Sequence, residues 1–124
     1  MYNFKTFHNL SLFENKIPAK NKNGKCFEVA LEYMYKNPTA TLVHGLVTGQ
    51  GPIEGILYNH AWVEKGNTVI DETVSLEIPK KLYYMIGQIK ESNVYRYSID
   101  EMNKKLLEYK TYGPWEKKLL KNKY

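Results

Sequence analysis

The sequence predicts an α+β fold in which a helix that carries Cys26 packs on a small antiparallel sheet. Residues 24–35 place apolar side chains three and four positions apart, as one face of a helix requires. Residues 39–47 are rich in β-branched side chains and lack this spacing, which is typical of a buried strand. Residues 55–73 contain a Lys-Gly pair between two short strand-like runs, the pattern of a hairpin.

The first helix is expected to begin at Gly24 and to end before Asn37-Pro38, because proline lacks the amide hydrogen that would continue it. Cys26 then lies in the first turn of this helix. Residues 1–23 mix apolar and polar side chains, and we expect a packed arm there, followed by a loop.

Further elements are expected after the hairpin. Residues 79–89 fit either a short helix or a strand-like crossing, and their pattern does not decide between the two. Residues 94–97 are expected to form a last short strand. Ser98 and Glu101 have the spacing of a capping box, which predicts a helix from there through about residue 109.

Length and composition limit the class of protein. A chain of 124 residues that is 43% hydrophobic can bury one core, so we expect a single domain over residues 1–124 with its core at about 24–73. The single cysteine excludes an internal disulfide and a four-cysteine zinc site. No apolar run approaches the roughly 20 residues that span a bilayer. We therefore expect a cytoplasmic protein with no membrane partner, and we expect no cofactor.

The net charge of +5 is carried by lysine, since Arg96 is the only arginine. Arginine supplies the paired hydrogen bonds that read guanine or clamp phosphate, so a specific nucleic-acid partner is not expected. The lysines gather in residues 16–25 and 104–123, and such clusters are usually solvated surface. An acidic partner is the alternative interpretation. The basic tail from Glu116 is expected to fray, and the many Lys, Asn and Tyr residues suggest a bacterial or phage source.

The hairpin allows a geometric prediction. If Lys65 and Gly66 form its loop, counting outward along strands 55–64 and 67–73 places Asp71 directly opposite His60. Opposed residues have Cβ atoms about 4.5 to 5.5 Å apart, close enough for a carboxylate to accept the imidazole proton. A turn shifted by one residue at each end would make the pair diagonal and still within reach.

This pair has the chemistry of the base and orienter of a catalytic triad. Asp71 would fix the tautomer of His60 and favour its protonated form. Cys26 is the candidate nucleophile, because a thiol in the first turn of a helix is close to the positive end of the helix dipole. Backbone N–H groups at that helix start would bind the oxyanion of a tetrahedral intermediate.

These residues resemble the core of the transglutaminase-like superfamily, which is related to the papain-like cysteine hydrolases. The resemblance is carried by Gly24-Lys25-Cys26, His60-Ala61-Trp62-Val63-Glu64, Val69-Ile70-Asp71 and Thr73, with Glu72 where the family usually has Pro. It implies that Cys26 is the nucleophile, His60 the general base and acid, and Asp71 the orienter. The superfamily includes proteases, transglutaminases, deamidases, amidases and inactive binding domains, so the resemblance does not select a reaction.

Other residues have both a functional and a plainer interpretation. His44 is a rival base or a proton donor at the site, or equally a buried structural histidine. His44, His60 and Asp71 together form a possible metal-ligand set, although their spacing follows no metal signature. Gln50 is a candidate for contact with a substrate carbonyl, in a segment that also fits a simple turn. Trp62 either walls the site or, more often for such a residue, belongs to the core.

The sequence therefore favours a cysteine hydrolase or acyltransferase that acts on an amide bond of a protein, peptide or small molecule. Such an enzyme would be a protease, deamidase or transamidase with a thioester intermediate. The alternative is a catalytically inactive binding or inhibitory module of the same fold, such as one that a phage encodes and directs at a host protein.

Overall fold

The fold is known from a computed structural model, which describes the backbone of residues 19–49 and 51–122 and the side chains from Lys25 onward. Most of the arm predicted over residues 1–23 lies outside the described residues. None of the described helices is long and apolar enough to cross a membrane.

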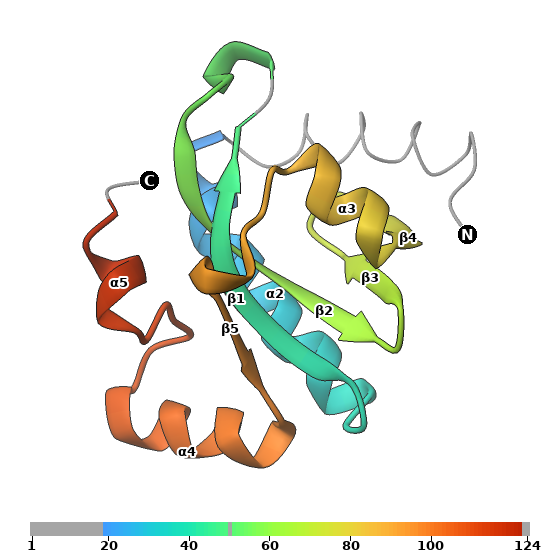
Figure 1. Cartoon of the computed structure of the whole chain (residues 1–124). Helices are drawn as coiled ribbons and strands as arrows, with labels where there is room; N and C mark the ends of the chain where they lie inside the picture. Colours follow the sequence, from blue (N-terminus) through green and yellow to red (C-terminus); the bar gives the residue numbers. More distant parts are fainter. Residues whose placement is uncertain (1–18, 50, 123–124) are drawn as a thin grey trace.

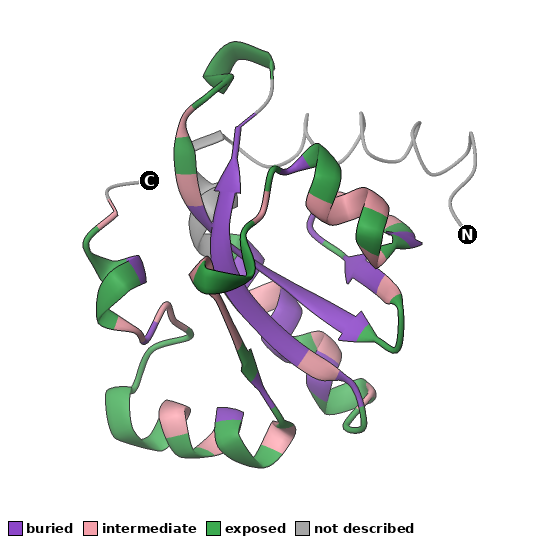
Figure 2. Ribbon diagram, in the orientation of Figure 1, coloured by how far each residue is buried: buried purple, intermediate pink, exposed green. Residues whose placement is uncertain are grey.

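A five-stranded sheet forms the centre of the molecule, with the strand order β4-β3-β2-β1-β5 and antiparallel pairing throughout (Figure 1). β1 and β2 are the long central strands, and their residues are largely buried on both faces (Figure 2). The strands are β1 (Thr41–Thr48), β2 (Leu57–Lys65), β3 (Thr68–Asp71), β4 (Leu76–Pro79) and β5 (Val94–Tyr97). This architecture agrees with the predicted α+β class.

Helices cover both faces of the sheet. Within the described part of the chain they are α2 (Ala19–Lys36), α3 (Lys80–Ile86), α4 (Ile99–Tyr109) and α5 (Lys117–Leu120), with short 3₁₀ turns at Gly51–Ile53 and Glu91–Asn93. α2 packs on the face that carries Ala61 and Val63 of β2. The tyrosines of α3 pack on the opposite face against Trp62. Successive strand residues point to opposite faces, so β2 contributes to both layers.

α2 begins earlier than the sequence predicted. It starts at Ala19, which places Cys26 about two turns inside the helix. The prediction that Cys26 lies in the first turn is therefore wrong. Gly24, expected to stand just ahead of the helix, lies within it, because one glycine weakens a helix without ending it. Since the backbone N–H groups near Cys26 are used inside α2, the start of this helix does not supply the predicted oxyanion site.

The hairpin also differs from the prediction by one residue at each end. β2 and β3 pair Lys65 with Thr68 and Val63 with Ile70, so the loop is Gly66-Asn67 and not Lys65-Gly66. Gly66 has φ +58, and hairpin turns with a left-handed first central residue favour glycine at that position. Lys65 consequently belongs to the strand. The direct opposition of His60 and Asp71 is wrong, and the diagonal arrangement holds.

The segment that the sequence left undecided forms β4 followed by α3. The capping box at Ser98 is confirmed, since its side chain accepts from the Glu101 backbone N–H and the Glu101 side chain accepts from the Ser98 backbone N–H. The tail from Glu116 was expected to fray and instead forms α5, so that prediction is wrong as far as Lys121. Asn59 Nδ2 on β2 donates to the carbonyl of Leu119 at 2.9 Å and holds α5 against the sheet.

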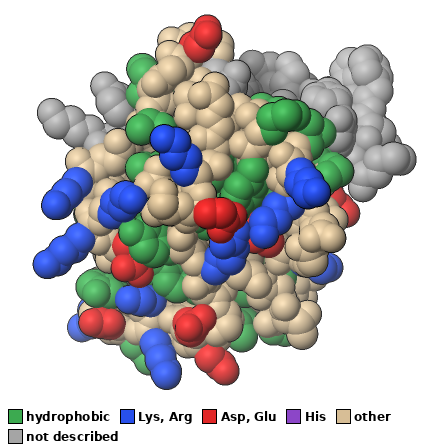
Figure 3. Space-filling model, viewed as in Figure 1, with side chains coloured by type: hydrophobic (Ala, Val, Ile, Leu, Met, Phe, Trp, Pro, Cys, Tyr) green, Lys and Arg blue, Asp and Glu red, His purple; other side chains and the backbone are tan. Residues whose placement is uncertain are grey.

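Basic and acidic side chains are interspersed on the surface. On the face shown in Figure 3, lysine and arginine side chains lie between acidic ones, and no field of a single sign covers that face. Net charge of this kind supports solubility and weak long-range attraction more than a defined docking site.

Replacement of Leu119 tests the packing of the tail. Leu119 is 0% exposed, so Leu119→Ala should lower the free energy of unfolding by about 2 to 5 kcal/mol, measured by urea denaturation. The neighbouring Leu120 is 59% exposed, and Leu120→Ala should change it by about 0.5 kcal/mol or less. Equal effects of the two substitutions would contradict the docking of α5.

Candidate functional site

His60 and Asp71 form a buried charged pair on the α3 side of the sheet. His60 Nε2 lies 2.7 Å from Asp71 Oδ2. Asp71 follows Ile70, the partner of Val63, so it lies level with Trp62 and diagonal to His60 on the same face. Diagonal residues on paired strands are farther apart than directly opposed residues. The length of the histidine side chain spans this extra distance to the carboxylate.

Cys26 reaches this pair from α2. Cys26 and His60 share a side-chain hydrogen bond. Asp71 engages Nε2 of the imidazole. The β2–β3 ladder runs only from Val63 to Lys65, so His60 lies beyond its end, where a side chain from α2 can approach the edge of β2. The three residues thus form one chain of hydrogen bonds that joins α2, β2 and β3.

The electrostatics favour a charged imidazole. Burial lowers the pKa of His60, but the negative charges of Asp71 and Cys26 and the hydrogen bonds to them outweigh it, and the pKa of His60 is raised well above its ordinary value. Burial likewise raises the pKa of Asp71, yet the charge of His60 and the hydrogen bonds around the carboxylate bring it below its ordinary value. The pair is therefore an imidazolium and a carboxylate.

Tyr83 is a member of the site that the sequence analysis did not assign. Its hydroxyl donates to Asp71 Oδ2 at 2.7 Å, the same oxygen that His60 approaches. Burial and the Asp71 charge raise the pKa of Tyr83 well above its ordinary value, so this phenol stays protonated and acts as a donor. Tyr83 lies in the segment whose structure the sequence left open, and only its position on α3 identifies it.

The thiol itself is covered. Cys26 is 1% exposed and contacts the core between α2 and the sheet. A cavity of about 180 Å³ on the α3 side extends to His60 and Asp71, and Tyr58 and Tyr83 line it as well. Access to the site is thus through the imidazole side, and the sulfur stands behind the ring that it contacts.

Trp62, which the sequence placed either at the wall of the site or in the core, is a core residue. Trp62 is 0% exposed and packs beneath the imidazole, with ring centroids 6.0 Å apart. Its indole Nε1 donates to Glu64 at 3.2 Å, which fits the core interpretation. Gln50 lies outside the described residues.

His44 is not part of this site. It pairs with Ala61 across β1 and β2 and so points to the α2 face, away from the His60 side chain. Its ring is enclosed by Phe27, Tyr97 and Trp115 at centroid distances of 4.7, 5.2 and 4.8 Å. Burial lowers its pKa to about 3, and neither ring nitrogen has a hydrogen-bond partner in the described part of the chain. The structural interpretation of His44 fits this environment.

The suggested metal-ligand set of His44, His60 and Asp71 is also not brought together, because its two histidines point to opposite faces of the sheet. Within the residues that the structure describes, no group of three or more His, Cys, Asp or Glu side chains is placed to hold a metal ion.

A second buried carboxylate, Glu64, fastens α3 to the sheet. Tyr84 donates to Glu64 Oε2, and Arg96 Nε donates to Glu64 Oε1 at 2.9 Å. Lys80 Nζ lies 3.5 Å from the same carboxylate. Burial raises the pKa of Glu64, but these hydrogen bonds and charges outweigh burial and lower it. The carboxylate therefore stays ionised and anchors α3 over His60 and Asp71.

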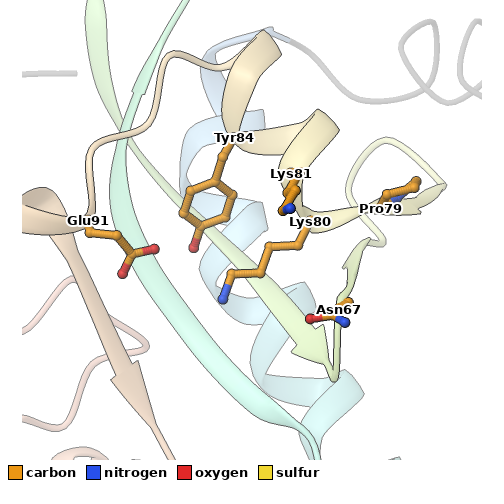
Figure 4. Close-up of a pocket in the computed structure, with 6 residues that line it drawn as sticks. All are labelled: Asn67, Pro79, Lys80, Lys81, Tyr84 and Glu91. Atoms are coloured by element: carbon orange, nitrogen blue, oxygen red, sulfur yellow. The ribbon is translucent and has the colours of Figure 1, made fainter.

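The outer surface of this anchor is hollowed. A depression of about 540 Å³ is lined by both Lys80 and Tyr84 of α3 and by Glu91 across from them (Figure 4). Arg96 holds Glu91 by two hydrogen bonds of 2.8 and 3.0 Å. The depression is larger than the cavity beside His60, but Lys80 and Glu91 in its wall are paired with Glu64 and Arg96, and none of its described lining residues belongs to the Cys26 chain of contacts. We therefore place the candidate active site at the smaller cavity.

Comparisons of the chain with protein-family models, with curated proteins and with solved structures found no match.

Replacement of His44 tests its buried neutral state. A histidine whose pKa is about 3 when folded and 6.5 when unfolded stabilises the fold above pH 6.5 and loses that contribution as the pH falls. Between about pH 6.5 and about pH 4.5 the wild type should lose on the order of 2 to 3 kcal/mol more unfolding free energy than His44→Phe. Urea denaturation at each pH measures this, and equal losses would contradict it.

Replacement of Asp71 tests the charged pair. Asp71→Asn removes the negative charge that outweighs burial, so the pKa of His60 should fall toward or below its ordinary value. NMR titration of the His60 ring protons measures the change. Tyr83→Phe is the matched control, since it removes one hydrogen bond to Asp71 but keeps the carboxylate. An unchanged pKa of His60 in Asp71→Asn would show that the two residues are not coupled.

Proposed function

We propose that this protein is a cysteine hydrolase or acyltransferase that acts on an amide bond through Cys26, His60 and Asp71. The observation that carries the proposal is the buried chain of hydrogen bonds from the thiol through the imidazole to the carboxylate. A buried charged pair costs free energy unless its groups are fully satisfied, and this pair gains a further donor from Tyr83. Strongly shifted pKa values cluster at functional sites.

In the proposed reaction, His60 already holds the Cys26 proton as an imidazolium, and the thiolate Sγ attacks the amide carbonyl carbon. The C–N bond then breaks, the amine leaves with the proton from His60, and a thioester remains on Cys26. Water attacks the thioester, giving a proton to His60, and the C–S bond breaks to release the acid and restore the thiolate beside the imidazolium. An amine in place of water would give transamidation, and ammonia as the leaving group would make the reaction a deamidation.

The roles follow from the contacts. His60 lies between nucleophile and carboxylate, so it can accept and return the proton without moving. Asp71 stabilises the imidazolium that forms, and Tyr83 holds Asp71 in its ionised form. These are the roles that the transglutaminase-like resemblance implies, and membership of that superfamily and a cytoplasmic location are parts of the proposal. The substrate would be a protein, a peptide or a small amide.

A second candidate is an inactive binding module of the same fold. The observation that favours it is the burial of Cys26, which is 1% exposed. A structural thiol in this position would be a small apolar core residue, and the charged pair would serve only to fix β2 to β3.

Alkylation of Cys26 separates the two functions. Cys26 is the only cysteine, so iodoacetamide should add one group to the native protein and none to Cys26→Ala, as measured by mass spectrometry. For an enzyme, the native rate should fall about 10-fold or more in His60→Ala, because the imidazole takes up the thiol proton. It should be unaffected by Leu119→Ala at a distant site.

An inert thiol would give the opposite pattern. Its alkylation would require the fold to open, so the alkylation rate would follow the free energy of unfolding. The rate would then rise in Leu119→Ala and would depend on His60 only through stability. That outcome would remove the proposed mechanism and leave the binding module.

A further inference from the structure

We infer that the cavity beside His60 is a specificity pocket for one short, uncharged, apolar group of the substrate. This inference rests on the proposed function and adds the class of substrate. The cavity of about 180 Å³ extends to His60 and Asp71, so a group held in it lies against the imidazole. Of the residues that the sequence suggested for substrate contact, His44 and Trp62 do not line it.

The wall of the cavity is apolar and comes from separate elements. Ile78 of β4 lines it and is buried, and Val74 and Leu76 line it and are half-buried. Ile86 of α3 contributes to the same wall and is 51% exposed, so an apolar surface continues from the cavity to solvent. A half-exposed apolar rim around a concave site is typical of a ligand entrance.

The charges of the wall are already paired. Among the described lining residues, His60 and Asp71 are the ionised groups, and they neutralise each other at 2.7 Å. The Tyr83 hydroxyl already donates its hydrogen bond to Asp71, and the Tyr58 ring packs against His60 at a centroid distance of 5.8 Å. A charged substrate group would lose its water here without gaining an opposite charge, whereas an apolar group would gain by leaving water.

The size of the cavity limits what it holds. Liquid water occupies about 30 Å³ per molecule, so 180 Å³ accommodates about six water-sized groups. This matches one branched or aromatic side chain or a short acyl chain, and it is below the roughly 300 to 1,000 Å³ of pockets that enclose a whole ligand. The remainder of the substrate would lie outside the cavity.

The cavity and the nucleophile are neighbours. His60 lines the cavity and forms a side-chain hydrogen bond with Cys26, so one side chain separates the cavity from the sulfur. An apolar group anchored there would set the distance between the adjoining amide carbonyl and the sulfur. Selection by this pocket would therefore act on the amide next to a leucine-like or phenylalanine-like group.

Binding is measured first without any reaction. N-isobutylacetamide is titrated into methyl-labelled protein, and the NMR shifts of Val74, Leu76, Ile78 and Ile86 are followed. Each added methylene should strengthen binding by about 3- to 4-fold, so this amide should bind tens of times more tightly than N-methylacetamide. N-acetylglycine, which carries a carboxylate, should not shift these methyl groups. Equal binding of the three compounds, or shifts located elsewhere, would overturn the inference.

Filling the pocket provides the variant test. Leu76→Trp should abolish the methyl shifts, and Ile86→Trp, at a more exposed position, takes its place if the first variant does not fold. The matched control is Leu107→Trp, an apolar position on α4 that is 79% exposed and does not line the cavity, and it should bind as the wild type does. Binding retained in a folded filled variant would also overturn the inference.

Reactivity links the pocket to the proposed function. Chloroacetamides that carry isobutyl, methyl or carboxymethyl groups alkylate Cys26 by forming a C–S bond and releasing chloride. The isobutyl compound should react at least 10-fold faster than the other two, and Leu76→Trp should remove the difference. Alkylation that depends on His60 but not on the side group would overturn the pocket and keep the proposed function. If the methyl shifts occur but alkylation does not depend on His60, the pocket remains as a binding site and the enzyme is rejected.

Discussion

The buried ion pair between His60 and Asp71 is the constraint on which the rest of the site depends. Two charges removed from water must be satisfied by each other and by further hydrogen bonds, or the fold loses several kcal/mol. The structure meets part of this demand with Tyr83 on Asp71 Oδ2 and Cys26 on the imidazole, while Asp71 Oδ1 is buried without a hydrogen-bond partner among the described residues. Each of these partners comes from a helix, on opposite faces of the sheet, so the pair also determines where α2 and α3 meet the strands.

A second buried carboxylate on the same face of the sheet is stabilised by hydrogen bonds in the same way. Asp71 and Glu64 are both buried carboxylates on the α3 face, and the consecutive residues Tyr83 and Tyr84 each donate to one of them. Arg96 completes the second group from β5. A short helix has little stability of its own, and these two charge-assisted contacts hold α3 in position. The wall of the cavity beside His60 therefore depends on a polar network outside the site.

His44 and His60 show how surroundings decide the state of a histidine. Both are buried in neighbouring strands, on opposite faces of the sheet. His44 is enclosed by aromatic rings, and burial keeps it neutral. His60 has a carboxylate and a thiol, and their charges overcome the same burial. The chemistry of the proposed enzyme thus belongs to the environment that β2, β3 and α2 create, and not to histidine as a residue type.

The sequence by itself determined the α+β class, the capping box at Ser98 and the shared face of His60 and Asp71, because these depend on local spacing and on the two-residue period of a strand. Tertiary structure alone decided the rest. α2 continues through Gly24, so Cys26 meets His60 by packing and not at a helix start. Tyr83 joins Asp71 only because α3 folds back across the sheet, a long-range contact that no spacing in the chain encodes.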